Sequence, residues 1–133
     1  MSDIFKRNEE LKVIVLTKRL IKHTMTLSNN SERYPKKARF TIVDPMQKTV
    51  IDIYKLLLKA NYLNTNIKAQ FEERQLCQSE AIYNCDILML YIELSLDANY
   101  INDRSCEYWV RLVMDVKKMI MAWKNADSKR SSF

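Results

Sequence analysis

The residues best suited to chemistry in this sequence are the cations of a short connection that contains a proline. Residues 34–41 read Tyr-Pro-Lys-Lys-Ala-Arg-Phe-Thr and place three cations within eight residues, directly before a strongly amphipathic segment. Lysine and arginine bind phosphate oxygens, and clustered cations on one part of a small domain are typical of a polyanion-binding surface. The connection therefore predicts phosphate contact, with a merely solvated face as the other interpretation.

Further cations extend this candidate surface into the flanking segments. Residues 1–68 contain fourteen Lys or Arg against six Asp or Glu, whereas residues 69–133 contain eight against ten. Because a helix does not enter the deep groove of A-form RNA, contacts to phosphate and to overall shape would dominate binding. The predicted nucleic-acid-binding residues are Lys12, Lys18, Arg19, Lys22, Lys36, Lys37, Arg39, Lys48 and Lys55.

Groups for catalysis and metal binding are sparse. The single histidine, His23, lies on an apolar helical stripe, where a core or interface imidazole with satisfied hydrogen bonds is its expected role. One histidine excludes the Glu-x-x-His pairs of di-iron bundles and the HExxH zinc motif. The chain has no glycine, which excludes the glycine-rich phosphate loops of Walker and dinucleotide-binding proteins. The acids of residues 72–97 leave a carboxylate-only magnesium site open by residue type, but their spacing favours a solvated face. We expect a noncatalytic protein without metal or cofactor.

Cysteine usage and the N-terminal sequence indicate an intracellular protein. Cys77, Cys85 and Cys106 are odd in number and include no CxxC pair, so neither a disulfide framework nor a zinc knuckle is indicated. Cys77 and Cys85 are expected to be small buried hydrophobic residues. Charged residues between positions 6 and 12 interrupt any apolar signal-peptide core. We therefore expect a cytoplasmic location and no contact with a membrane.

Hydrophobic periodicity predicts four helices joined by short connections. The expected ranges are 8–28 with Asn8 as N-cap, 42–62 with Asp44 as cap and Pro45 in the first turn, 65–98 and 103–124. A frayed basic tail is expected over residues 125–133. Residues 1–133 thus form one all-α domain, an antiparallel up-down four-helix bundle. The segment 87–92 is apolar all round, which predicts burial on every side.

The second predicted helix carries more apolar surface than one core requires. Outside its main face, Ile51, Leu58 and Tyr62 widen the apolar arc to roughly 200°. The surplus predicts a second buried contact, which we assign to an interface between subunits.

The basic connection and the helix after it resemble a known family. Residues 34–41, the segment VIDIYKLLLKANY at 50–62, Trp109 with Arg111, and the pair Ala122 and Trp123 are similar to accessory variability determinant proteins, and the resemblance covers nearly the whole chain in helix order. It implies a four-helix bundle that assembles as a homopentameric barrel with a basic surface. It further implies binding to the reverse transcriptase of a diversity-generating retroelement and to its template RNA or RNA–DNA hybrid, in support of mutagenic cDNA synthesis. The positions that match the family's basic residues are Lys36, Lys37 and Arg39.

A sister group, the four-helix proteins encoded in 23S rRNA intervening sequences, shares the aromatic-Pro-Lys opening. Those proteins typically continue with a glycine-containing stretch after the second helix begins, whereas this chain has Met-Gln-Lys-Thr-Val-Ile-Asp at 46–52. The difference favours the retroelement branch. A structural or interaction module of the intervening-sequence type is the alternative function.

Overall fold

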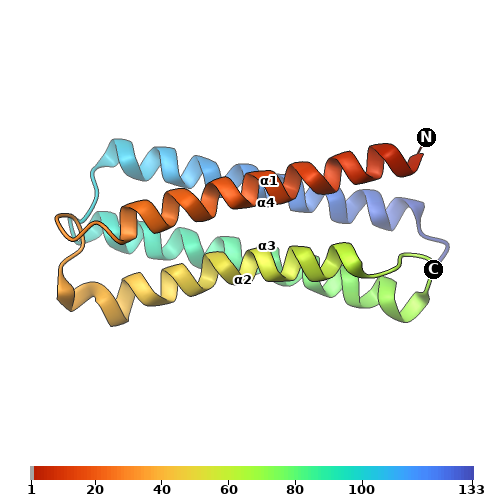
Figure 1. Cartoon of the computed structure of the whole chain (residues 1–133), viewed down its shortest axis with the longest axis horizontal. Coiled ribbons are helices and arrows are strands. Elements are labelled where there is room, and N and C mark those ends of the chain that lie inside the picture. The colour runs from red at the N-terminus through yellow and green to blue at the C-terminus, as the bar shows by residue number, and fades with distance from the viewer. Residues whose placement is uncertain (1) are drawn as a thin grey trace.

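The computed structural model shows an elongated bundle of antiparallel helices (Figure 1). It describes the backbone of residues 2–133 and the side chains of residues 12–133. Over the described backbone the α-helices are α1 (Ser2–Ser28), α2 (Asp44–Tyr62), α3 (Lys68–Asp97) and α4 (Asp103–Arg130), and there is no strand. α1 and α3 each pack against α2 and α4. The all-α four-helix fold predicted for the chain is therefore confirmed.

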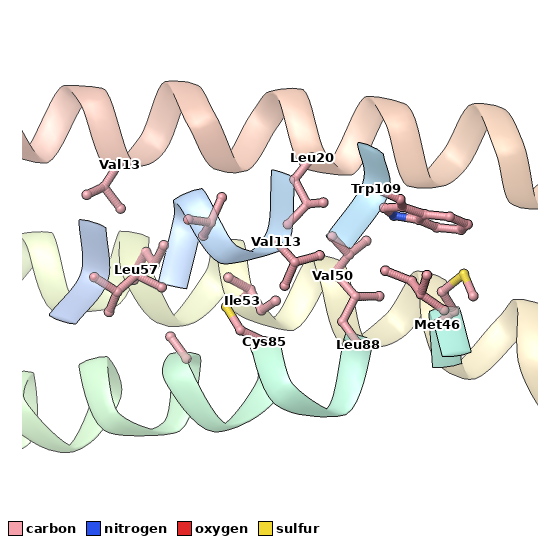
Figure 2. Packing of buried hydrophobic residues seen from close by; sticks show 14 of the residues in the cluster. Val13, Leu20, Met46, Val50, Ile53, Leu57, Cys85, Leu88, Trp109 and Val113 are labelled. Carbon is pink, nitrogen blue, oxygen red and sulfur yellow. The ribbon is translucent and has the colours of Figure 1, made fainter. Parts of the chain in front are cut away.

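The core runs along the centre of the bundle as successive layers of buried apolar side chains (Figure 2). One face of α2 supplies the fully buried residues Met46, Val50, Ile53, Leu57 and Ala60. Steps of three and four residues keep such a set on one side of a helix. Full burial of a large apolar side chain contributes about 1.5–3 kcal/mol. These layers set the spacing of the helices, and the outer faces are left to carry charge.

Asparagine takes the place of glycine in the turn between α3 and α4. Asn99 has φ 63°, the one positive φ in the described part of the chain. Asn102 then caps α4, because its side-chain oxygen accepts a hydrogen bond from the Ser105 backbone N–H at 2.8 Å. Between α2 and α3, by contrast, the Asn64 side chain accepts a hydrogen bond from the backbone N–H of Asn66 at 2.8 Å. Both turns therefore form without glycine, by two different uses of asparagine.

Three helix ends differ from the predicted ones by three or more residues. α1 is already helical at Ser2, so Asn8 lies inside the helix and is not its N-cap. A cap contributes only about 1 kcal/mol, and no residue from 2 to 7 breaks a helix. α3 starts at Lys68 because residues 64–66 form the turn. α4 continues to Arg130, so the tail predicted to fray over 125–133 is helical for most of its length. Buried Asp127 holds those last turns against α3.

The connection between α1 and α2 is itself largely helical. After Pro35, whose backbone is extended at ψ 163°, a 3-10 turn (Lys36–Ala38) and a π turn (Arg39–Val43) lead directly into α2. Val43, which precedes α2, is already in helical conformation, and no side chain caps this helix start. The predicted capping role of Asp44 is therefore wrong, because the helical path already begins at Lys36.

The apolar segment 87–92 of α3 is not buried on every side. Leu88 and Ile92 are fully buried, but Leu90 is 48% exposed. A helix in this bundle packs against two neighbours, so one face of it stays outward. The prediction of burial all round is wrong for the single chain.

Candidate nucleic-acid interface

Buried residues fix the basic connection to one end of the bundle. Tyr34 is buried, and its ring centre lies 5.3 Å from that of Tyr100 in the α3–α4 turn, which is at the same end (Figure 1). Ala38 and Val43 also point inward and are each 1% exposed. The cations Lys36, Lys37 and Arg39 are exposed between these anchors. The connection is thus an anchored basic protrusion.

All nine predicted cations are exposed, but acids neutralise them to different extents. Lys48 pairs with Asp52 at 2.7 Å, and Arg39 lies 3.5 Å from Asp44. Such exposed pairs contribute about 0–1 kcal/mol and open readily. Seven form no ion pair with any described side chain, namely Lys12, Lys18, Arg19, Lys22, Lys36, Lys37 and Lys55. These seven are the cations most available to an anionic partner.

The fold divides the predicted cations into two groups. Lys18 and Lys22 precede Met25 by seven and three residues, and Met25 lines an open groove of about 390 Å³ with Lys48 and Lys55 of α2. Residues at such steps share a helix face, so the α1 and α2 cations border the same groove. We call the combined surface the basic face; it consists of Lys18, Lys22, Lys36, Lys37, Arg39, Lys48 and Lys55.

The remaining two cations lie on the other side of α1. Lys12 borders a cavity between α1 and α4, and Arg19 follows it by seven residues on the same face. The structure therefore does not bring Lys12 and Arg19 together with the basic face.

Phe40 is a candidate contact residue that the search for cations in the sequence did not identify. Its side chain is 83% exposed, the highest value among the large apolar side chains described, and it directly follows Arg39. In the sequence it stands three residues before Val43, a spacing that in a regular α-helix would place it on the buried face of α2. The π turn over Arg39–Val43 has more residues per turn than an α-helix, which changes that phase. An exposed ring beside cations offers a stacking surface to an unpaired base.

The predicted interface residues of α2 are used mostly within the chain. Ile51 packs against the core and lines the α1–α2 groove, and Leu58 is half-buried. Tyr62 is 79% exposed. Ile51 thus contributes to the α1–α2 packing, and Tyr62 is the most exposed of the three.

A buried ion pair ties the opposite end of the bundle. The Arg74 and Asp127 side chains are 2% and 0% exposed, and Arg74 donates from Nε to Oδ2 at 2.7 Å and from Nη2 to Oδ1 at 3.1 Å. Gln78 donates to the same carboxylate at 2.8 Å, and the guanidinium carbon lies 4.6 Å from the centre of the Trp123 ring. Arg74 Nη1 also donates to the backbone carbonyl of Ala60 at 3.2 Å. This network joins α2, α3 and α4 and is structural in character.

His23 packs between α1 and α4. Its ring centre lies 5.1 Å from that of Tyr108 and 5.7 Å from that of Trp109, both edge to face. Its Nε2 is enclosed without a hydrogen-bond partner among the described residues. Burial lowers the pKa of His23 below its usual value of 6.5, because the charged imidazolium is poorly solvated there. The predicted core or interface position agrees with this packing, but the prediction that the imidazole has its hydrogen bonds satisfied is wrong for Nε2.

This lowered pKa predicts that acid destabilises the fold. Between the unfolded pKa of 6.5 and the lower folded pKa, the unfolded chain binds more protons, so stability is complete above pH 6.5 and falls as pH drops. One such group gives a slope of no more than about 1.4 kcal/mol per pH unit. Urea unfolding midpoints between pH 5 and 7.5 measure it. The His23→Gln variant should lack this dependence of stability on pH. An equal dependence in both proteins would assign the effect to other titratable groups.

Two observations on the described side chains concern metal binding and thiol reactivity. Within residues 12–133 no three His, Cys, Asp or Glu side chains cluster closely enough to hold a metal ion. Cys77 and Cys85 are buried, as predicted, and burial raises the pKa of Cys85 to about 12. A thiol in that environment is not a nucleophile at neutral pH.

Comparison with known proteins adds no relative. No protein-family model matches the chain, and neither does any curated protein or solved structure. Over the described residues, no helix has an apolar stretch long enough to cross a bilayer.

Proposed function

We propose that this protein is a noncatalytic accessory subunit of a diversity-generating retroelement. It binds the template RNA or the RNA–DNA hybrid through the basic face, docks on the reverse transcriptase, and assembles as a homopentamer. The observation that carries the nucleic-acid part is the anchored connection, on which Lys36 and Lys37 are exposed and form no ion pair with a described side chain, with the exposed ring of Phe40 three residues after Lys37. The partner and the assembly follow from the family resemblance of residues 34–41 and 50–62.

The basic face supports binding in which phosphate contacts supply the affinity. Each lysine that neutralises a phosphate releases a bound counterion, which is favourable at low salt and weakens as salt rises. Lys18, Lys22 and Lys55 extend the contact from the connection along the α1–α2 side. Phe40 adds a surface for one unpaired base, so a flexible single strand suits the site better than a duplex. Such contacts carry little sequence information.

Binding to a single-stranded RNA of about 20 nucleotides should therefore depend steeply on salt. With four to seven phosphates contacted, the slope of log K against log salt is expected to be roughly −3 to −5, which lowers affinity about 60- to 1,000-fold between 50 and 200 mM salt. Fluorescence anisotropy measures this, with a duplex of the same sequence as the comparison. Flat affinity over this range would contradict the proposal and favour the alternative of a structural module of the intervening-sequence type.

Co-expression tests the partner directly. The chain, a retroelement reverse transcriptase and its template RNA are expected to purify together at moderate salt. Recovery of the polymerase without the RNA would retain the docking part of the proposal and remove the RNA part.

A further inference from the structure

The outer face of α3 carries an apolar stripe that no other helix of the chain covers. Its members are Leu76, Tyr83, Leu90 and Leu94, which are 69%, 63%, 48% and 40% exposed. They are spaced by seven, seven and four residues, so they lie on one face of the helix over about 27 Å. We call this set the α3 stripe. Leu90 and Leu94 are one turn apart and the others follow at two-turn steps, so the stripe is a row of exposed apolar side chains, and exposed apolar surface of this kind is typical of interaction sites.

Acids line both edges of the α3 stripe. At 100° per residue Glu80 lies on the edge toward α2, and Glu93 and Asp97 lie on the edge toward α4. None of these three forms an ion pair with a described side chain. The surface is thus apolar along its middle and negative along its sides.

The groove between α1 and α4 has the opposite charge. It encloses a cavity of about 490 Å³ with apolar walls that include Leu16, Met119 and Ala122, and it is bordered by Lys12 on α1 and Lys118 on α4. Arg19 continues the α1 edge seven residues after Lys12, and residues 12–28 contain no acid. Asp115 is the one acid that borders this cavity among the described residues. We call this surface the α1–α4 groove.

We propose that the α3 stripe of one copy of this chain docks in the α1–α4 groove of another copy. An apolar ridge with acidic edges matches an apolar groove that is bordered by Lys12, Arg19 and Lys118 against the single acid Asp115, and the two belong to the same molecule. This inference rests on the self-association in the proposed function and deepens it by naming the two surfaces. It moves the interface from Ile51, Leu58 and Tyr62 of α2 to α3 and the α1–α4 pair.

The contact has two structural consequences. The two surfaces are different, so the contact is head to tail, and such a contact closes into a ring when its rotation allows. It also uses Lys12 and Arg19, the two predicted cations that lie away from the basic face. Nucleic acid and a second copy can then bind to one molecule at the same time.

Charge reversal gives a direct test. One variant carries Lys12→Glu and Lys118→Glu, and the other carries Glu80→Lys and Glu93→Lys. Each alone is expected to associate at least 10-fold more weakly than the wild type, measured as mass by light scattering against a protomer of 15.9 kDa. An equimolar mixture should reach a higher mass than either variant alone, because the reversed groove of one variant matches the reversed stripe of the other and their unaltered surfaces also match. The two variants must alternate in such a head-to-tail contact and cannot close a five-membered ring, so the mixture is expected to form open or even-numbered assemblies. All four positions are exposed, so circular dichroism should show unchanged helices.

Tyr62→Ser is the matched control, because it removes an exposed aromatic ring from α2 and is expected to leave the mass unchanged. A monomeric wild type would overturn the inference, as would variants that keep the wild-type mass or a mixture that does not reassociate. Dissociation by Tyr62→Ser alone would place the interface on α2. RNA affinity, measured by anisotropy with Lys36→Ala as a positive control, reports separately on the proposed function, so its loss and the loss of self-association are distinguishable.

Discussion

Replacing Asp127 with alanine is expected to lower the free energy of unfolding by about 3–5 kcal/mol, because it leaves the Arg74 guanidinium buried without its counterion. Arg74 is 2% exposed and donates two hydrogen bonds to the carboxylate, so water cannot take the place of the lost partner without opening the end of the bundle. Gln78 loses an acceptor in the same variant. For a domain of this size, whose total stability is of the order of 5–15 kcal/mol, the loss is a large fraction.

Urea unfolding followed by circular dichroism measures this loss. Lys117→Ala is the control, since it breaks the Lys117–Asp86 pair of 2.7 Å, in which Asp86 is 52% exposed, and should cost less than about 1 kcal/mol. The double variant Arg74→Met with Asp127→Leu should be more stable than Asp127→Ala, because it removes both charges together. Equal losses in Asp127→Ala and Lys117→Ala would mean that the last turns of α4 contribute little, as a frayed tail would.

The same network shows where sequence patterns are sufficient and where they are not. Asp127 follows Trp123 by four residues on the buried face of α4, and Arg74 follows Phe71 by three on that of α3. A charged residue that falls on the apolar face of a predicted helix is the sequence feature that indicates such a buried ion pair. In a C-terminal segment rich in Ser, Lys and Arg that signal is weak, because most charges there are solvated.

The four helices themselves were predictable because burial imposes a period of three to four residues over long segments. Their ends were not, since a cap contributes only about 1 kcal/mol and tertiary contacts override it. Asn8 and Asp44 are good capping residues by type, yet both lie within continuous helical backbone.

For the candidate site, exposure of the cations followed from charge alone, because an unpaired lysine is rarely buried. The division of these cations between two sides of α1 did not follow from charge. It depends on which residues of α1 face α2 and which face α4, and this is fixed only when the bundle assembles. The direction of Phe40 depends on a π turn, for which the sequence contains no distinct signal.

Removing the three cations of the connection together is expected to weaken RNA binding most. Each lost phosphate contact takes about 0.7 from the salt slope, which at 0.1 M salt is about five-fold in affinity, so Lys36→Ala, Lys37→Ala and Arg39→Ala combined should cost roughly 100-fold. Arg39 also lies 3.5 Å from Asp44, and because that exposed pair is weak, its loss should not unfold the bundle.

The matched control removes the same charge from α3 and α4, through Lys68→Ala, Arg111→Ala and Lys129→Ala. These residues are exposed and lie outside the basic face, and charges beyond about 10 Å are largely screened at this salt, so a loss of only a few-fold is expected. Anisotropy with the 20-nucleotide strand measures the RNA affinity of both triple variants, and circular dichroism verifies their folds.

Equal losses of affinity in the two triple variants would show that net charge alone drives binding. Unfolding of the connection variant would instead assign residues 36–39 a structural role. A loss confined to that variant would locate the phosphate contacts at the end of the bundle, where Tyr34 and Tyr100 hold the connection in place.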